Sequence, residues 1–220
     1  MSETLPSYTV RRVAPFAACA EVGAAPWRDL HTLSDLVAPA GVDPPAKATT
    51  VKACHDGRSL HVLFHCEDPD VRATLRHRDA HLWEESAVEM FISPTCSVER
   101  YFELQVNAIG TIFDARITNP GGARGKGFAF DPNWDCPGLT VTPAGSGRFN
   151  GTADRDAWWA VHVAIPFDSL DASGPSDGDR WRANFYRIEQ SGRALAASWS
   201  PLPKLDFHQA HRFGELVFVD

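Results

Sequence analysis

A tryptophan in an acidic setting is the first feature of this 220-residue sequence that could do chemistry. Glu84 and Glu85 follow Trp83 directly, and Glu89 comes shortly after them in a strand-like stretch. A tryptophan on a polar rim is typical of a surface that contacts a ligand, because its large ring is apolar on both faces. The alternative interpretation is a ring that caps one end of the fold.

A second set of candidate residues carries planar or hydrogen-bonding groups at alternate positions of three expected strands. The set comprises Glu89, Glu103, Gln105, Asn107, Arg182, Asn184 and Tyr186. Sugar hydroxyls donate and accept hydrogen bonds at once, and short stiff polar groups of this kind can fix their orientation. The set therefore favours a surface that binds a polyhydroxylated ligand. The alternative is a solvated outer face, which antiparallel sheets commonly have.

The elements that must position these residues are predicted to be strands, because apolar and polar residues alternate along them. The predicted strands cover residues 48–53, 59–68, 87–93, 101–107, 158–166, 179–189 and 214–220. Asp56-Gly57 predicts a hairpin between the first two, and Gly- and Pro-rich turns separate most others. This pattern predicts one domain over residues 1–220, an antiparallel β-sandwich of immunoglobulin-like or jelly-roll-like type. A short irregular or helical segment is expected over residues 27–36.

Composition excludes several classes of protein. The hydrophobic fraction of 44% is enough for a core, and a net charge of -7 argues against nucleic acid or an anionic membrane as a partner. No apolar run approaches the length of a membrane span, and the first residues do not resemble a signal peptide. We therefore expect a soluble protein, cytoplasmic as the sequence is written. Its 5 cysteines form no C-x-x-C pair, so reduced thiols are expected.

Catalytic and metal motifs find little support. The G-x-S-x-G match at 174–178 precedes a predicted strand rather than a helix, so we interpret it as a hairpin loop and not a nucleophile elbow. His61 and His65 share a strand face but are separated by about 13 Å. Glu67, Asp68 and Asp70 could hold a structural calcium, although we favour the alternative, a strand end followed by a proline turn. We expect no cofactor and no catalytic metal.

Three stretches of the sequence, in order, resemble the family 9 carbohydrate-binding modules. The block WEESAVEMFISP is preceded by LHVLFHCEDPDV and followed by YFELQVNAIG, and the chain ends in SWSPLPKLDFHQAHRFGELVF. The variant at the end is similar to a stand-alone, family 9-like branch. The resemblance covers about residues 51–218 and implies a β-sandwich that binds sugars.

The resemblance also implies roles for single residues. In that family two aromatic rings clamp a terminal glucose unit, and the matching positions here are Trp83 and Phe207. The family's hydrogen-bonding glutamate matches Glu89, and its basic residue on the next strand matches Gln105. Phe207 replaces a tryptophan and Gln105 replaces a cation, so this chain departs from the family at two of the four positions. We expect Asn107, Arg182, Asn184 and Tyr186 to complete the rim.

The expected function is non-catalytic binding of a mono- or oligosaccharide, linked to polysaccharide catabolism as an accessory to glycoside hydrolysis. A hydrolase is the first alternative, since paired carboxylates could be drawn from Glu84, Glu85, Glu89 and Glu103. A haem-binding electron-transfer domain is the second, because related sandwiches carry haem. Met90 would have to be the axial ligand, yet its strand position faces the core.

Overall fold

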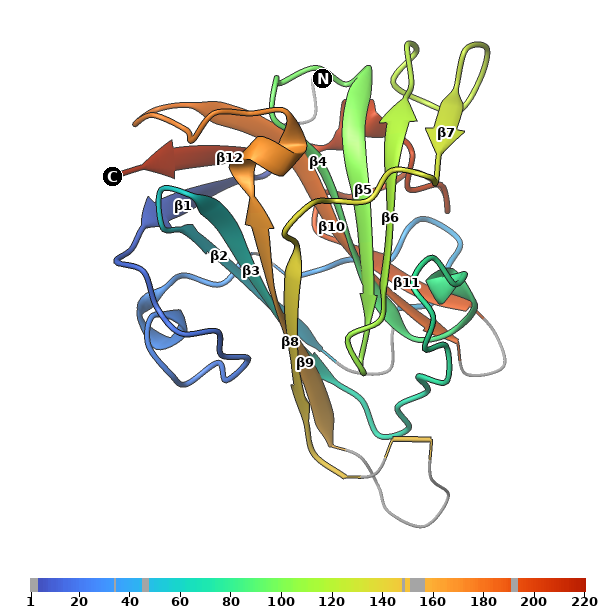
Figure 1. Ribbon diagram of the computed structural model, residues 1–220. Coiled ribbons are helices and arrows are strands. Elements are labelled where there is room, and N and C mark those ends of the chain that lie inside the picture. Colours follow the sequence, from blue (N-terminus) through green and yellow to red (C-terminus); the bar gives the residue numbers. More distant parts are fainter. Residues whose placement is uncertain (1–3, 34, 45–47, 148, 151–156, 191–193) are drawn as a thin grey trace.

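The computed structural model describes residues 4–33, 35–44, 48–147, 149–150, 157–190 and 194–220. Strands dominate these residues (Figure 1). They are β1 (Ser7–Arg12), β2 (Thr49–His55), β3 (Ser59–Glu67), β4 (Ala87–Ser93), β5 (Arg100–Asn107), β6 (Ile112–Thr118), β7 (Ala129–Asp131), β8 (Thr140–Gly145), β9 (Trp158–Pro166), β10 (Arg180–Gln190), β11 (Ala194–Ser198) and β12 (Gly214–Val219).

The helices of the described residues are single short turns of 3-10 type, none of which could cross a membrane. They are η1 (Trp27–Asp29), η2 (Leu82–Glu84), η3 (Phe167–Leu170) and η4 (Ala210–Arg212). The all-β prediction is confirmed. The segment expected to be helical or irregular at residues 27–36 contains η1 and is otherwise irregular over its described part.

The strands form one continuous sheet in the order β7-β6-β5-β4-β10-β12-β1-β2-β3-β9-β8, and β11 pairs with β10 beside β12. Pairing is antiparallel except at β1, which runs parallel to both β12 and β2. The sheet is curled, so that β4, β5, β6 and β10 form one layer and β2, β3, β8 and β9 the other (Figure 1). The sandwich prediction is confirmed, with these two parallel pairings as a feature that alternation alone could not predict.

The main core lies between the two layers. Val88 and Met90 from β4 and Val62 and Phe64 from β3 are all fully buried in one hydrophobic cluster. They occupy alternate positions, as the period-2 pattern of each strand requires. Met90 therefore points into the core.

The hairpin predicted at Asp56-Gly57 is confirmed. β2 and β3 pair from Thr49 opposite Cys66 to His55 opposite Leu60. Gly57 has φ +88°, which a residue without a Cβ adopts freely, and Asp56 Oδ1 accepts the backbone N–H groups of Arg58 and Ser59 at 2.8 Å.

Two turn predictions are wrong in part. Residues 174–178 form a loop between η3 and β10, but β9 and β10 do not pair, so the loop belongs to a crossover between layers and not to a hairpin. Residues 142–145 begin one of the Gly- and Pro-rich stretches that were expected to form turns, but they belong to the edge strand β8. Pro143 is tolerated there because an edge strand need not donate every N–H group.

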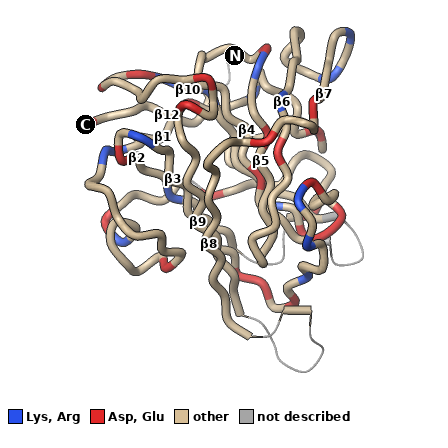
Figure 2. The backbone as a smooth tube through the Cα atoms, in the orientation of Figure 1, with Lys and Arg blue, Asp and Glu red and all other residues tan. Residues whose placement is uncertain are grey.

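Neither β8 nor β9 carries a charged residue (Figure 2).

Candidate functional site

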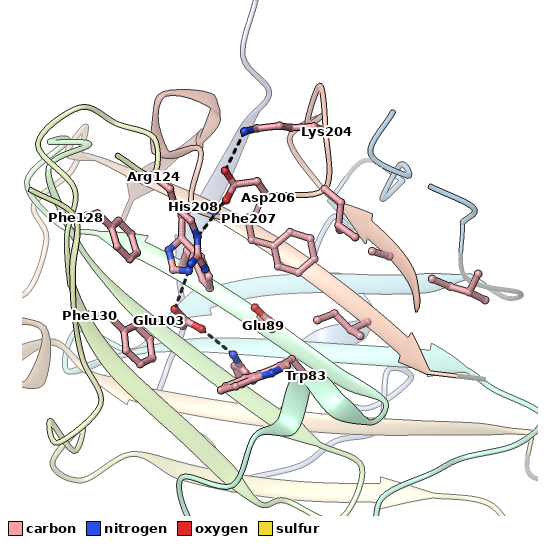
Figure 3. Close-up of a pocket in the computed structure, with 16 residues that line it drawn as sticks. Trp83, Glu89, Glu103, Arg124, Phe128, Phe130, Lys204, Asp206, Phe207 and His208 are labelled. Carbon is pink, nitrogen blue, oxygen red and sulfur yellow. Dashed lines mark hydrogen bonds and ion pairs between the residues drawn. The ribbon is translucent and has the colours of Figure 1, made fainter. Parts of the chain in front are cut away.

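The outer face of β4, β5 and β10 is covered rather than open to solvent. The segment that contains η2 lies over one end of it, and the segment between β11 and β12 lies over the other. A pocket of about 800 Å³ remains between these covers. Its lining residues are Trp83, Glu89, Phe91, Glu103, Gln105, Arg124, Phe128, Phe130, Ile188, Leu195, Ala196, Lys204, Leu205, Asp206, Phe207 and His208 (Figure 3).

The polar floor of the pocket comes from β4 and β5. Glu89 on β4 lies opposite Gln105 on β5 in the antiparallel register. Glu103 comes two residues before Gln105 on β5, and residues two apart on a strand point to the same face. All three side chains therefore point to the same face of the sheet. Each is at most 4% exposed. Gln105 Nε2 donates a hydrogen bond of 2.7 Å to Glu103 Oε1.

Burial sets the charge of this floor. Desolvation raises the pKa of Glu103 to about 7, against the smaller opposing effects of the Gln105 hydrogen bond and Arg124. Desolvation also raises the pKa of Glu89 well above its usual value, and the neighbouring charge of Glu103 adds to that shift. Two carboxyls this close resist ionising together, so at neutral pH the pair holds a proton that isolated glutamates would have lost.

A chain of hydrogen bonds supports the floor from behind. Asn119 Nδ2 donates to Tyr101 Oη at 3.3 Å, and the Tyr101 hydroxyl and His208 Nδ1 share a hydrogen bond of 2.8 Å. Burial, with the charge of Arg124, lowers the pKa of His208 to about 3. The imidazole is therefore neutral at pH 7, and its Nε2 lies 3.6 Å from Glu103 Oε2.

Charged groups at the rim are paired with one another. Asp206 lies 3.5 Å from both Arg124 Nε and Lys204 Nζ. The Arg124 guanidinium also lies 5.1 Å from the centre of the Phe128 ring. The rim thus carries two cations for one anion, and Asp206 holds them together (Figure 3).

Aromatic rings form the walls. Trp83 stacks on His81 with ring centres 4.5 Å apart and meets Phe113 edge-on at 5.3 Å. On the other side Phe207 stacks on Tyr186 at 4.1 Å. In Figure 3 the carboxyls of Glu89 and Glu103 lie between the rings of Trp83 and Phe207.

Four of the eight predicted sugar-binding residues line this pocket, namely Trp83, Glu89, Gln105 and Phe207. They reach it from three separate parts of the chain. The pocket also contains residues that the predicted site omits. Glu103 belonged to the predicted polar face, and strand alternation alone could have added it. Arg124, Phe128 and His208 lie on loops, and no periodic pattern marks them.

The other four predicted residues lie behind the pocket, where they hold its covering segments in place. Asn107 Nδ2 donates to Leu75 O at 2.9 Å. Asn184 exchanges hydrogen bonds with the backbone of Ser200 at 3.1 and 2.8 Å. The Arg182 guanidinium donates to the backbone oxygens of His211 and Phe213, and the Tyr186 hydroxyl donates to Phe207 O at 3.0 Å. These contacts give each residue a structural role.

Candidate cation ligands have partners within the protein. Asp68, one of the residues considered for calcium, accepts hydrogen bonds from Arg187 at 2.8 Å and from Trp159 Nε1 at 3.3 Å. Oxygens of Asp79, Asp114 and Asp135 lie within 4.8 Å of one another, and Arg78 forms ion pairs with all three carboxylates. In both clusters an arginine supplies positive charge.

His61, considered as a metal ligand, lies away from His65 and contacts another imidazole. Cys19 N–H donates to His162 Nδ1 at 3.2 Å, and His162 Nε2 lies 3.0 Å from His61 Nδ1. Burial and the neighbouring His61 lower the pKa of His162 to about 4. The pair therefore packs as neutral rings beneath Phe16 and Trp27.

Comparison with known proteins identifies the family to which this sequence is similar. The model of the family described as carbohydrate-binding family 9 matches residues 44–218. A comparison with curated proteins returns no match.

Solved structures share the fold. A candidate carbohydrate-binding protein from Bacteroides uniformis has a TM-score of 0.79 and 20% identity over 97% of this chain and 99% of that chain. A carbohydrate-binding module of family 9 from Caldicellulosiruptor kristjanssonii, in complex with cellotriose, has a TM-score of 0.67 and 15% identity over 97% of this chain and 93% of that chain. The family 9 module from the same organism in complex with glucose has a TM-score of 0.64 and 15% identity over 96% of this chain and 95% of that chain.

Proposed function

The chain belongs to carbohydrate-binding family 9, and we propose that the pocket between Trp83 and Phe207 binds a mono- or oligosaccharide without chemically changing it. The observation that carries this proposal is the arrangement of the pocket. Aromatic rings stand at opposite walls, and a floor of buried Glu89, Glu103 and Gln105 lies between them. The related modules crystallised with cellotriose and with glucose support the same ligand class.

The two parts of the pocket match the two parts of a pyranose. Its C–H faces are apolar, and the rings of Trp83 and Phe207 would remove them from water. Its equatorial hydroxyls would reach the carboxyl and amide groups of the floor, and each hydroxyl can donate to one group and accept from another. Asp206 and Arg124 at the rim would contact hydroxyls farther from the floor.

A binding role fits the carboxyls better than hydrolysis does. Two-carboxyl glycosidases keep one group protonated and the other ionised. Here burial raises the pKa of both Glu89 and Glu103, and the charge of Arg124 opposes this shift only in part and only at Glu103. We propose an accessory role in carbohydrate catabolism, in which the protein holds a sugar that separate enzymes make or consume.

Isothermal titration calorimetry with a panel of saccharides that includes glucose and cellotriose tests this function. We expect saturable binding by the wild type and a loss of at least about tenfold in affinity for Trp83→Ala, the loss of one stacked ring. Trp158→Ala is the matched control. Trp158 is also half-buried and also stacks on a histidine, His65, but it lies on β9 in the other layer.

The controls separate binding from fold and from catalysis. Trp158→Ala should bind as the wild type does, and no reducing sugar should be released from oligosaccharides during long incubation. A folded wild-type protein that binds no saccharide of the panel, or equal binding by Trp83→Ala, would contradict the proposed site.

A further inference from the structure

We propose that the pocket prefers a saccharide that carries a protonated primary amine over the corresponding neutral sugar. This inference rests on the proposed sugar-binding function and names the chemical class of ligand for the same site. It follows from three features of the pocket: the hydrogen-bonding capacity of its floor, the charge of its floor, and the rings of its walls.

The floor has buried acceptors that lack partners. Glu103 Oε2 and Gln105 Oε1 are buried and have no hydrogen-bond partner, and the nearby His208 Nε2 lies 3.6 Å from Glu103 Oε2, beyond hydrogen-bond distance. The amide nitrogen of Gln105 already donates to Glu103 Oε1. The Glu89 carboxyl adds further acceptor capacity from the adjacent strand.

An ammonium group matches such a floor better than a hydroxyl does. A hydroxyl brings one donor and brings lone pairs that need donors themselves, whereas an ammonium brings three donors and no acceptor. Hydrogen bonds from a charged donor to a carboxylate are also roughly twice as strong as neutral ones. Buried acceptors that lack partners cost free energy until a ligand satisfies them.

The floor also lacks a counter-charge of its own. Glu89 and Glu103 lie on neighbouring strands with Gln105 beside them, where an amide supplies no positive charge. The other charged or titratable groups that face them are Arg124, Lys204 and Asp206 at the rim, the neutral His208, and the hydroxyls of Tyr101 and Tyr186. Asp206 pairs with both rim cations, so neither cation is bonded to the floor. A ligand ammonium would let both carboxyls ionise.

The walls favour a cation as well. Trp83, Phe207, Phe128 and Phe130 all line the pocket, and the negative face of an aromatic ring attracts a cation within about 6 Å. The same protein already uses this contact at the rim, where Arg124 lies 5.1 Å from the centre of the Phe128 ring.

Titration of the folded wild-type protein with glucosamine, glucose and N-acetylglucosamine tests the preference, at a pH where the glucosamine amine is protonated. N-acetylation removes the charge and keeps the ring. We expect glucosamine to bind at least about tenfold more tightly than glucose, as expected for a charged donor set in a desolvated aromatic site. In buffers of different ionisation enthalpy, glucosamine binding should release protons and glucose binding should not.

Two variants and a control locate the effect. Glu103→Gln and Glu89→Gln keep the shape of the floor and should each reduce the preference for glucosamine to about threefold or less. Glu67→Gln removes an exposed carboxylate at the end of β3, in the other layer, and should leave the preference intact. Methylammonium chloride shows whether the sugar ring is needed, and it should not displace glucosamine at equal concentration.

The outcomes separate this inference from the proposed function. Binding of glucose with no gain for glucosamine would overturn the amine preference and leave sugar binding standing. Binding of methylammonium as tight as that of glucosamine would overturn it too, since the ligand would then be a simple cation. Failure of every saccharide to bind would overturn both.

Discussion

The rings of Tyr186 and Phe207 lie 4.1 Å apart and only 9° from parallel, and the Tyr186 hydroxyl donates a hydrogen bond of 3.0 Å to the backbone oxygen of Phe207. Tyr186 comes from the middle of β10 and is fully buried, whereas Phe207 is half-buried on the loop before β12. A fixed ring of the sheet thus sets the orientation of a ring on a loop. At the opposite wall His81, an exposed residue just before η2, stacks on Trp83.

We predict that the size of the ring at position 207 controls sugar affinity. Phe207→Ala should raise the Kd about threefold to tenfold, because a stacked aromatic ring contributes about 0.5–1.5 kcal/mol beyond its buried area. Phe207→Trp should lower the Kd, because the larger indole covers more of the sugar face. Calorimetric titration measures both effects.

Tyr186→Phe is the control for Phe207. It keeps the ring that stacks on Phe207 and removes only the hydroxyl, so we expect a change in Kd of less than threefold, within the worth of one neutral hydrogen bond. If Phe207→Ala bound sugar as tightly as the wild type, the ring would be part of the cover and not of the binding site.

We predict that Glu103 makes the protein less stable as pH rises. Its pKa is about 7 in the folded state and about 4.3 in an unfolded chain. The folded state therefore binds more protons between these values, and stability falls as pH rises from about 4.5 to 7. The full effect is about 4 kcal/mol. Glu103→Gln carries no charge at any pH, so it should become more stable than the wild type above pH 7.

Urea denaturation of both proteins at pH 5 and pH 8 measures this effect as a difference. The wild type must be compared with Glu103→Gln because His208 and His162 change the stability of both proteins with pH in the opposite direction. Their folded pKa values are about 3 and about 4, so their contribution to stability is lost as pH falls. If the difference in free energy of unfolding between the wild type and Glu103→Gln were the same at pH 5 and at pH 8, the prediction would be wrong.

The sequence predicted seven strands with bounds within about two residues of those observed, because the alternation of apolar and polar residues is strong in each. β3 and β9 show why this works: each has one face in the core, so a slip of one residue would expose it. Five strands were not predicted: β1, β6, β7, β8 and β11. β1 is defined by parallel pairing with β12 at the far end of the chain, which no local pattern encodes.

The sequence could not distinguish the outer-face residues that line the pocket from those that lie behind it. Asn107, Arg182, Asn184 and Tyr186 were correctly placed on the outer face but not recognised as anchors of the covering segments. A polar residue on an outer face looks the same in sequence whether it meets water, a ligand or another segment. Only the path of the covering loops, which is a tertiary property, distinguishes these cases.

We predict that the buried ion pair between Arg187 and Asp68 is essential for stability. Arg187 is fully buried, and its Nη2 lies 2.8 Å from Asp68 Oδ2. Asp68→Asn would leave the guanidinium with Glu189, at 3.4 Å, as its remaining ion-pair partner. We expect the free energy of unfolding to fall by about 3 kcal/mol, the lower end of the cost of breaking a buried pair, as measured by urea denaturation.

Asp70→Asn is the matched control for Asp68. Asp70 lies two residues farther on and pairs at 3.5 Å with Arg72, and both side chains are more than half exposed. Surface pairs of this kind contribute roughly 0–1 kcal/mol, so stability should hardly change. If Asp68→Asn and Asp70→Asn lowered the free energy of unfolding equally, burial of the Arg187–Asp68 pair would not determine how much it contributes to stability.

We predict that a single methyl group at Gly214 disrupts the junction between the core and the pocket cover. A Cβ at this position would lie 2.5 Å from Trp199 Cζ3 and 2.8 Å from Pro6 O. Trp199 is only 2% exposed within the core, so neither neighbour can move away freely. Gly214→Ala should lower the free energy of unfolding by about 1–3 kcal/mol, the usual cost of overpacking.

Gly23→Ala is the control, because no atom lies within 4 Å of a Cβ built there. Alanine at an open position restricts the unfolded chain, so this variant should match the wild type or exceed it by up to about 1 kcal/mol. β12 begins at Gly214 and the segment carrying Phe207 ends just before it. A shift of Trp199 should therefore also weaken sugar binding by Gly214→Ala. Wild-type stability with wild-type affinity in that variant would show that Trp199 can move without disturbing either the core or the cover.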